Sequence, residues 1–448
     1  MSETLKSIVR NMTELLGQAH EGIVSALCAG NMNTAAALLS DCQDGAIALG
    51  TKIEEIKKTS DVIGVLEQYC ETLYILHEKL LKTGIIDTEV FSDTLSENLY
   101  AIKESVRKNI LERKTVVFLP YKASMWDSLE SVWEVAKADP DCDTYVVPIP
   151  YYEKKSDGMF GQMYYEGDQY PEYVPITDYH DFNFGLHHPD MIFIHNPYDA
   201  YNYVTSVHPF FYSKNIKEFT DNLIYIPYFV LDEVDPGNKN AVEEMAHFCT
   251  APAVMNADTV IVQSEKMRRV YIRALTETLG EKTKGQWEKK ILGLGSPKYD
   301  KVLTKAGNIE IPEKWGKIIY NENGIKKKVV FYNNGLGALL QSREAMLNKI
   351  EKVLQAFKKN RDEVAFWWRP HPLMKSTIQS MCPGIWEQYE RMIEAYQREG
   401  WGIYDDTADL DRAVKLSDVY YGDPSSVIQL FQSMGKPAII QEVEKEQI

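Results

Sequence analysis

The spacing of hydrophobic residues divides the chain into a helical first segment and a longer remainder in which strands alternate with helices. Over residues 1–110, hydrophobic positions recur every three or four residues, which is the period of an α-helix with one buried face. Breaks at Gly30-Asn31, Thr59-Ser60 and Thr83-Gly84 separate four such segments. The pattern predicts four antiparallel helices, or two long hairpins. The expected buried positions are Leu5, Ile8, Met12, Leu15, Ala19, Ile23 and Ala26, then Ala35, Leu39, Cys42, Ala46, Leu49, Ile53 and Ile56, then Val62, Leu66, Tyr69, Leu73, Leu76 and Leu80, and finally Leu95, Leu99, Ile102 and Val106.

This helical region contains no arrangement of residues that suggests catalysis. His20 and His77 are single helical residues for which we expect structural roles. Two interpretations remain open. The bundle is typical of an oligomerisation or docking module, which would make the protein a homo-oligomer, and a bundle buried against its own chain fits the pattern equally well.

From Lys114 onward, short β-prone runs alternate with helical segments. Strands are predicted at 115–120, 143–150, 191–195, 222–227 and 258–263, and, after the pattern restarts, at 328–332, 364–368, 402–404 and 419–421. Helices are predicted at 125–137, 241–256, 265–279, 342–359, 385–399 and 410–416, with one more starting at 425. Such alternation predicts parallel sheets with helices on both faces. The expected fold class is α/β, with a helical bundle (1–112) followed by two Rossmann-like domains (113–290 and 291–448) that face a cleft.

Composition narrows the class of protein. The 448 residues are 44% hydrophobic and 25% charged, as in a soluble globular protein, and no apolar run approaches the roughly 20 residues that span a bilayer. The six cysteines are scattered without zinc spacing, which predicts a reducing, cytoplasmic compartment. A net charge of −16 argues against nucleic acid as a partner.

One segment departs from this acidic balance. Residues 282–328 contain twelve lysines, no arginine and five acidic residues, a local net charge of +7. The simpler interpretation is a basic surface that faces solvent. The more specific interpretation is peripheral contact with an anionic membrane or a polyanionic acceptor.

A candidate phosphate site lies near the C-terminal end. Residues 417–441 are predicted to form a strand, a turn at Gly422-Asp423-Pro424, a helix beginning at Ser425 and Ser426, and a second strand after Gly435. The first-turn N–H groups of a helix have no partner within the helix, and the helix dipole is positive there. Two hydroxyls at that point would favour a phosphate, although an ordinary serine cap is the alternative.

Three further features fall at the carboxyl ends of strands or between the two α/β halves. They are the segments 295–300 (GSPKYD), 333–337 (NNGLG, with Gly335 and Gly337) and 369–372 (RPHP, with Arg369 and His371). Glycine allows close approach of a backbone to phosphate, and a guanidinium and an imidazole supply charge and hydrogen bonds. Each feature alone is weak evidence, but ligands in open parallel sheets bind beyond the carboxyl ends of the strands, where these features meet.

Together these segments resemble the CDP-glycerol glycerophosphotransferases, enzymes of the GT-B fold that build teichoic-acid-type polymers. GSPKYD is similar to the Gly-x-Pro-Arg-x-Asp element of that family, RPHP to its x-x-His-Pro strand end, and SDVYYGDPSSV with the following GKP to its Ser-Asp…Ser-Ser-Val…Lys-Pro segment. The likeness covers roughly residues 290–441. It implies that Arg369, Ser425 and Ser426, with Asp423, Gly335 and Gly337 beside them, bind a donor diphosphate, and that His371 assists the transfer. No metal or cofactor is expected.

The first α/β half departs from the family pattern. The His-Gly pair that carries the expected base has no counterpart at 225–229 (YIPYF). The nearby substitutes are His195 with Asp199, and His208. The group His187, His188 and Asp190 suggests a metal site, but a polar loop is the favoured interpretation.

The resemblance predicts a cell-envelope transferase that moves glycerophosphate from CDP-glycerol to a polyol or glycan hydroxyl and releases CMP. Three alternatives stay open: a GT-B glycosyltransferase that uses a nucleotide sugar, a two-domain epimerase, and a catalytically silent GT-B-like scaffold.

Overall fold

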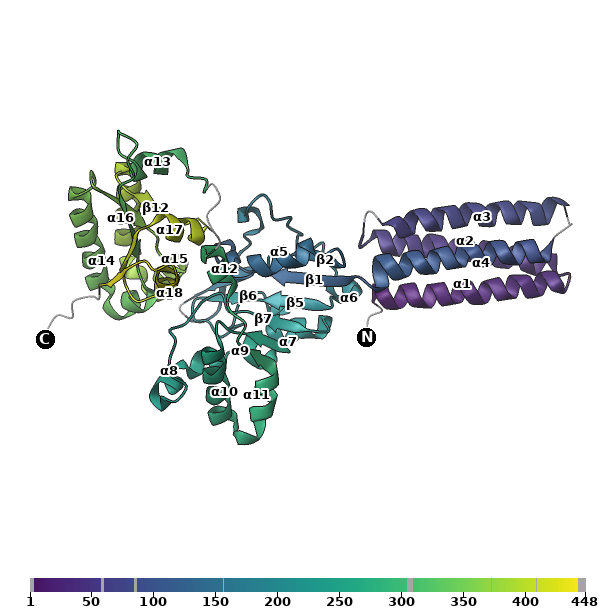
Figure 1. Ribbon diagram of the computed structural model, residues 1–448, viewed down its shortest axis with the longest axis horizontal. Helices are drawn as coiled ribbons and strands as arrows, with labels where there is room; N and C mark the ends of the chain where they lie inside the picture. The colour runs from purple at the N-terminus through teal and green to yellow at the C-terminus, as the bar shows by residue number, and fades with distance from the viewer. Residues whose placement is uncertain are drawn as a thin grey trace. The chain divides into compact units, whose positions relative to one another are not determined.

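The computed structural model describes residues 4–57, 60–83, 87–155, 157–303, 309–371, 373–407 and 409–441, and it divides into two compact units. One unit comprises Met1–Val116 with 139–143 and 183–190, and the other comprises the rest of the chain. Four long helices in the first unit run side by side (Figure 1). They are α1 (Leu5–Cys28), α2 (Met32–Glu54), α3 (Asp61–Thr83) and α4 (Thr88–Val106).

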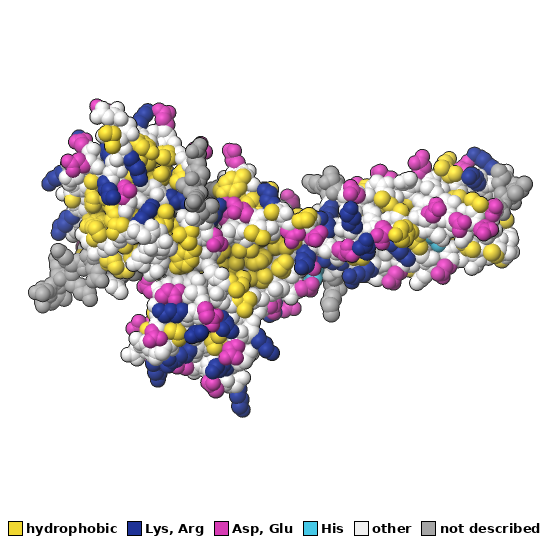
Figure 2. Space-filling model, viewed as in Figure 1, with side chains coloured by type: hydrophobic (Ala, Val, Ile, Leu, Met, Phe, Trp, Pro, Cys, Tyr) yellow, Lys and Arg dark blue, Asp and Glu magenta, His cyan; other side chains and the backbone are white. Residues whose placement is uncertain are grey.

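The ends of these helices are set by capping side chains. Thr4, Asn31 and Asp87 each accept a backbone N–H from the first turn of α1, α2 and α4. The outer surface of the bundle carries interleaved Lys, Arg, Asp and Glu side chains, as expected for helices with one buried face (Figure 2). Among the described residues, no helix is both long and apolar enough to cross a membrane.

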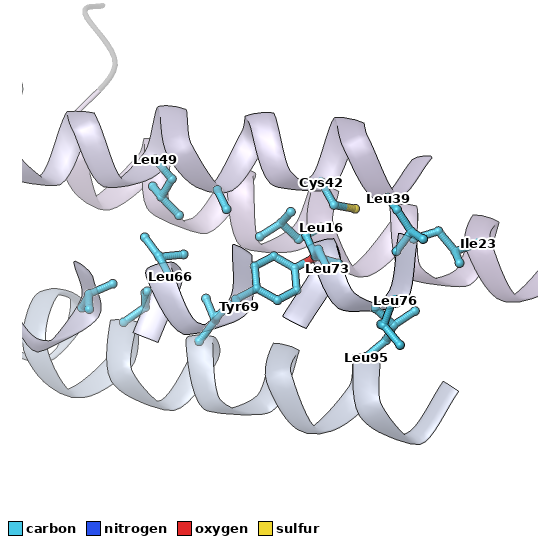
Figure 3. Close-up of a cluster of buried hydrophobic side chains, with 14 of the residues drawn as sticks. Leu16, Ile23, Leu39, Cys42, Leu49, Leu66, Tyr69, Leu73, Leu76 and Leu95 are labelled. Atoms are coloured by element: carbon cyan, nitrogen blue, oxygen red, sulfur yellow. The ribbon is translucent and has the colours of Figure 1, made fainter. Parts of the chain in front are cut away.

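The bundle interior confirms most of the predicted buried positions (Figure 3). The predicted positions of α2 from Ala35 to Ile53, and all those of α3, are buried. In α1, Leu5, Ile23 and Ala26 are buried as predicted, but Leu15 is 55% exposed while Leu16 and His20 are buried. His20 accounts for the difference: its Nε2 lies 2.6 Å from the Tyr69 hydroxyl, so this polar residue occupies a core position.

A six-stranded sheet forms the first α/β half, with strand order β2-β1-β5-β7-β8-β9. The predicted strands are confirmed; β9 was not foreseen. The strands are β1 (Lys114–Leu119), β2 (Cys142–Val146), β5 (Met191–Ile194), β7 (Leu223–Tyr225), β8 (Thr259–Ile261) and β9 (Ile291–Leu292). The principal helices are α5 (Glu130–Ala138), α8 (Lys239–Cys249), α9 (Pro252–Asn256), α10 (Glu265–Leu279) and α11 (Lys284–Lys290), and the shorter ones are α6 (Phe184–His187) and α7 (Ser213–Ile216).

Besides β9, a 3-10 helix and a second sheet in this half were not predicted. A 3-10 helix, η2 (Ala123–Ser128), precedes α5 where one continuous helix was expected. A separate antiparallel sheet, of strand order β4-β3-β6, consists of β3 (Tyr151–Lys154), β4 (Phe160–Tyr164) and β6 (Thr205–Val207). This small sheet places Tyr151 beside the end of β1, which matters for the site described below.

The second α/β half has five parallel strands in the order β12-β11-β10-β13-β14. The strands are β10 (Lys328–Asn333), β11 (Val364–Trp368), β12 (Ile403–Tyr404), β13 (Val419–Gly422) and β14 (Ala438–Ile440). The helices are α12 (Pro297–Leu303), α13 (Glu313–Ile319), α14 (Leu336–Lys359), α15 (Met374–Met381), α16 (Trp386–Glu399), α17 (Leu410–Leu416) and α18 (Val427–Ser433). The expected class, α/β with two parallel-sheet domains after a helical bundle, is therefore confirmed.

Both sheets reverse their direction of growth next to their first strand, β1 in one half and β10 in the other. In open parallel sheets such a reversal leaves a crevice at the carboxyl ends of the strands, and ligands bind there. At the second reversal, β10 and β13 approach very closely. A side chain at Gly422, whose φ is +140°, would place its Cβ 2.2 Å from the Asn333 carbonyl oxygen.

Candidate active site

A cavity of about 630 Å³ lies between the two α/β halves. The first half contributes residues that follow β1, together with Glu166 and Gln169; the second contributes residues that follow β11 and β12. The lining therefore comes from the carboxyl ends of both parallel sheets. Its members are Lys122, Ala123, Ser124, Glu166, Gln169, Arg369, Pro370, His371, Met374, Lys375, Trp386, Tyr389, Ile393, Tyr404, Asp405, Asp406 and Thr407.

Arg369 is a buried cation of this cavity. The residue is 4% exposed, and its guanidinium lies 2.7 Å from a carboxylate oxygen of Asp405 and donates to the Thr407 carbonyl. Asp405 is completely buried. Burial alone would raise the pKa of Asp405, but Arg369 and the hydrogen bonds from Thr407 and Trp367 lower it. Nη1 of Arg369 is the nitrogen that faces the Asp405 carboxylate and Nη2 is the one that donates to Thr407, so both terminal nitrogens have partners within the protein.

His371 lies in the same cavity and is neutral. Burial, followed by the nearby Lys122 ammonium, lowers the pKa of His371 to about 4. Its Nδ1 accepts the Leu373 N–H at 3.1 Å, so the neutral ring carries its proton on Nε2. His371 can therefore donate a hydrogen bond through Nε2 at neutral pH. Pro372, the last residue of the RPHP segment, lies outside the described residues.

Sequence reasoning missed the residues on the opposite side of the cavity. Lys122 Nζ donates to the Tyr151 hydroxyl at 2.8 Å and lies 3.3 Å from Glu166 Oε1. The Tyr151 hydroxyl donates to the same oxygen at 2.7 Å, and the Ala123 N–H donates to Glu166 Oε2 at 2.9 Å. The sequence could have indicated Lys122 as a site residue, because it follows a buried strand closely. Glu166 lies in a loop without a recognisable motif.

His195 and Asp199, predicted as catalytic, are both buried and hydrogen-bonded to residues of the fold. His195 is fully buried, its Nε2 accepts the Tyr121 N–H at 3.0 Å, and its Nδ1 lies 2.9 Å from Ser128 Oγ. Burial, and secondarily Lys298, lowers the pKa of His195 to about 3. The Asp199 carboxylate accepts the Ser213 N–H and hydroxyl. Neither side chain lines the cavity, and no hydrogen bond joins the two among the described residues.

The residues predicted to bind phosphate near Asp423 and Ser425 lie outside the cavity, at the β10–β13 reversal. One Asp423 oxygen accepts the Gly335 N–H at 2.8 Å, and the other pairs with the buried Lys349 ammonium. Ser425 Oγ lies 3.1 Å from the Tyr420 hydroxyl and accepts the Val427 N–H. Helix α18 begins at Val427, with Ser426 at the cap position and no capping bond from its side chain. Gly337 lies in the first turn of α14.

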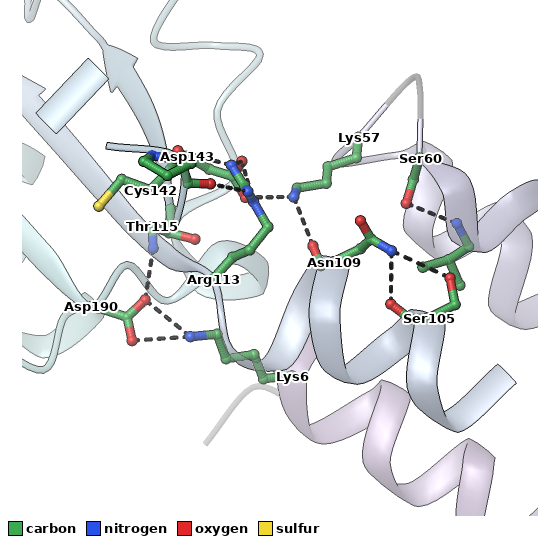
Figure 4. Close-up of polar contacts among 12 residues, drawn as sticks. Lys6, Lys57, Ser60, Ser105, Asn109, Arg113, Thr115, Cys142, Asp143 and Asp190 are labelled. Atoms are coloured by element: carbon green, nitrogen blue, oxygen red, sulfur yellow. Dashed lines mark hydrogen bonds and ion pairs between the residues drawn. The ribbon is translucent and has the colours of Figure 1, made fainter. Parts of the chain in front are cut away.

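The remaining predicted elements are also engaged within the fold. Lys298 of the GSPKYD segment forms a buried ion pair with Asp127, at 2.7 Å to one oxygen. His208 stacks on Tyr152, and its Nδ1 accepts the Phe210 N–H. Asp190, considered with His187 and His188 as a metal group, binds Lys6 at 3.0 Å and the Thr115 N–H at 2.7 Å (Figure 4). Within the described residues, no three His, Cys, Asp or Glu side chains gather in a way that could hold a metal ion.

Most lysines of the 282–328 segment that the structure describes have acidic neighbours. Lys301 pairs with Glu130 at 2.9 Å, Lys317 with Glu313 at 2.7 Å and Lys326 with Asp418 at 3.7 Å. In the lobe that contains α8, α10 and α11, basic and acidic side chains are interleaved (Figure 2). The predicted contact with a membrane or polyanion stays a prediction.

No family model and no curated protein sequence matches this chain. Among solved structures, S. aureus MnaA with UDP is 12% identical, over 73% of this chain and 78% of that chain, with a TM-score of 0.42. The UDP-GlcNAc 2-epimerase of Methanocaldococcus jannaschii, in complex with UDP-GlcNAc and UDP, is 11% identical over 73% and 83%, with a TM-score of 0.39. The fold assignment rests on the strand order and parallel pairing of the chain itself.

Proposed function

We propose that the chain is a transferase whose substrate is linked to a nucleoside diphosphate and binds in the cavity between the α/β halves. The observation that carries this proposal is the convergence of three donors on one cavity: Lys122 from the first half, and Arg369 and His371 from the second. A diphosphate needs several donors at close range, and a guanidinium supplies strong, charge-assisted ones.

The rest of the lining fits a base or a sugar ring. Trp386, Tyr389 and Tyr404 give the cavity an aromatic side, with the aliphatic parts of Met374 and Ile393 beside them. Flat apolar surfaces with a few polar groups are typical of small-ligand sites. The charged groups of the lining balance one another, with three lysine or arginine residues and three acidic ones, so the cavity suits a ligand that is only partly anionic.

Two donors are candidates, and the geometry ranks them. CDP-glycerol is supported by the likeness of the three motifs to the glycerophosphotransferases. However, Lys298 of the first motif pairs with Asp127, and Asp423 of the third pairs with Lys349, and neither residue lines the cavity. We therefore place a nucleotide sugar first and CDP-glycerol second. Two alternatives remain. An epimerase would isomerise a nucleotide sugar without an acceptor, whereas a silent scaffold would turn over no substrate.

In the proposed transfer, the acceptor hydroxyl attacks the donor and the nucleotide leaves with the electron pair of the broken bond. His371 would donate a hydrogen bond through Nε2–H to a phosphate oxygen of the leaving nucleotide, and with a pKa of about 4 the ring that makes this bond is neutral at pH 7. Arg369 would stabilise the negative charge that develops there.

Calorimetric titration with UDP, GDP and CDP tests the proposal. We expect one of the three to bind, and Arg369→Lys to weaken that binding by about tenfold or more, because an ammonium cannot bond both Asp405 and Thr407 while facing a phosphate. Arg398→Lys is the matched control, since Arg398 is exposed on α16 and does not line the cavity. A folded wild-type protein that binds none of the three would contradict the proposal, and the nucleotide preferred separates the two candidate donors.

A further inference from the structure

The proposed transfer needs a group that accepts the proton of the attacking hydroxyl, and the cavity offers few. His371 cannot serve, because Nδ1 already accepts a backbone N–H and Nε2 carries the proton of the neutral ring. The Asp405 oxygens accept bonds from Thr407 and Trp367 and lie against Arg369. His195 is buried with both ring nitrogens engaged.

Two carboxylates of the lining remain, Glu166 and Asp406. Asp406 is exposed, and its neighbour Asp405 turns into the core of the second half. Glu166 has a side chain that is only 14% exposed and is held at both oxygens. A proton acceptor works best when it is fixed in one geometry beside the reacting group, and Glu166 alone meets that requirement.

We propose that Glu166 is the catalytic base of the transfer, an inference that rests on the proposed function. Its Oε2, which accepts one N–H from Ala123, takes the proton of the acceptor hydroxyl. The hydroxyl oxygen forms a bond to the electrophilic atom of the donor, and the bond from that atom to the nucleotide oxygen breaks. The nucleotide leaves with that electron pair, and the proton stays on Glu166 until it exchanges with water.

Lys122 and Tyr151 are positioning residues in this arrangement. Both donate to Glu166 Oε1, whereas Oε2 accepts a single N–H and keeps the capacity to accept a proton. Burial, together with the charge of Glu166, raises the pKa of Tyr151 well above its usual value, so the phenol stays protonated and continues to donate. The Lys122 ammonium lies 4.4 Å from the centre of the Tyr151 ring, a cation–π contact that fixes both side chains.

Acceptor-independent nucleotide release tests this assignment, because water can replace the acceptor hydroxyl. The probes are UDP-N-acetylglucosamine, UDP-glucose, GDP-mannose and CDP-glycerol, with released nucleotide measured enzymatically. We expect Glu166→Gln to lower turnover by about 100-fold or more while the affinity for the free nucleotide stays within about threefold. Glu172→Gln, at an exposed position outside the cavity, is the control and should match the wild type.

Tyr151→Phe gives a second readout through the split between turnover and affinity. Without the hydroxyl that holds Glu166 Oε1, the carboxylate loses its fixed geometry, so turnover should fall by about tenfold or more while the affinity for the free nucleotide stays within about threefold; a simple loss of packing would weaken both. Wild-type turnover that Glu166→Gln leaves unchanged would overturn the assignment of the base and leave the proposed function standing. Absence of both nucleotide binding and release in the wild type would overturn both.

Discussion

The two α/β halves reverse their strand order in the same way, yet they fill the reversal point with different chemistry. Between β1 and β5 the first half places a neutral imidazole, His195, which bonds the Tyr121 N–H and Ser128. Between β10 and β13 the second half places an ion pair, Asp423 with Lys349. In both halves the point where topology favours a ligand is filled by the protein itself.

The comparison separates polar groups that hold the fold from those available to a ligand. At the two reversal points, His195 and the Asp423–Lys349 pair find their partners within the protein. In the cavity, Glu166 keeps bonding capacity on Oε2, which accepts the Ala123 N–H. A carboxyl-end position in a parallel sheet therefore indicates a site only when the hydrogen bonds there are incomplete.

The largest effect should come from breaking the ion pair of the second reversal. Asp423→Ala leaves the Lys349 ammonium, which is 7% exposed, without its partner carboxylate, and should destabilise this half by roughly 3–5 kcal/mol. Urea unfolding followed by tryptophan fluorescence measures the loss. The double variant Asp423→Ala, Lys349→Met should recover much of it, because no buried charge then remains. A single variant as stable as the wild type would show that the pair does not hold this crevice.

A smaller, pH-dependent effect is expected at the start of α17. Burial, together with the hydrogen-bonded Asp411 carboxyl, raises the pKa of Asp409 to about 7. Because the folded state then binds a proton more tightly than the unfolded chain, this group stabilises the protein at low pH, and the contribution is lost as pH rises toward 7. Asp409→Asn mimics the protonated form and still accepts the Arg412 N–H that caps the helix.

The melting temperature of Asp409→Asn relative to the wild type should therefore rise between pH 5 and pH 8. Asp87→Asn, which replaces the capping aspartate of α4, is the matched control and should show no such trend. A constant difference across the pH range would contradict the raised pKa.

The smallest effect is expected where an ion pair faces solvent. Lys6 and Asp190 have side chains 25% and 27% exposed, in contrast to the buried pair of Asp423. Lys6→Ala should cost about 1 kcal/mol or less, and the cost should shrink as salt rises. Thermal unfolding at low and high ionic strength measures it. A loss as large as that of Asp423→Ala would remove the distinction between the two kinds of pair.

Much of the fold could be predicted because burial follows the hydrophobic period. The stripes of α2 and α3 are regular, and nearly all their predicted positions are buried. In α1 the prediction failed at Leu15, and it overlooked the polar residues Thr13 and His20, which occupy core positions where Thr13 bonds the Val9 carbonyl and His20 bonds Tyr69. A hydrophobic period cannot reveal a buried polar side chain whose partner lies on another helix.

The site was predicted only in part. Arg369 and His371 follow a buried strand directly, so their position at a carboxyl edge could be predicted from the chain. Glu166 is more than 40 residues from Lys122, and the contact between them depends on the small antiparallel sheet that brings Tyr151 to both. The Ser425 segment was attractive because it resembles a phosphate-binding turn; its surroundings depend on Tyr420, whose hydroxyl lies beside Ser425 Oγ.

The hydrogen bonding of His195 has a spectroscopic consequence. A neutral imidazole whose Nε2 accepts the Tyr121 N–H carries its proton on Nδ1 and directs it at Ser128 Oγ. His195 has no solvent-exposed surface, so this proton is shielded from water. Such a proton exchanges slowly with water and should give a resolved downfield resonance in a nuclear magnetic resonance spectrum. Because Lys122, next to Tyr121 in the chain, lines the cavity, that resonance would report ligand binding in unlabelled protein without any substitution.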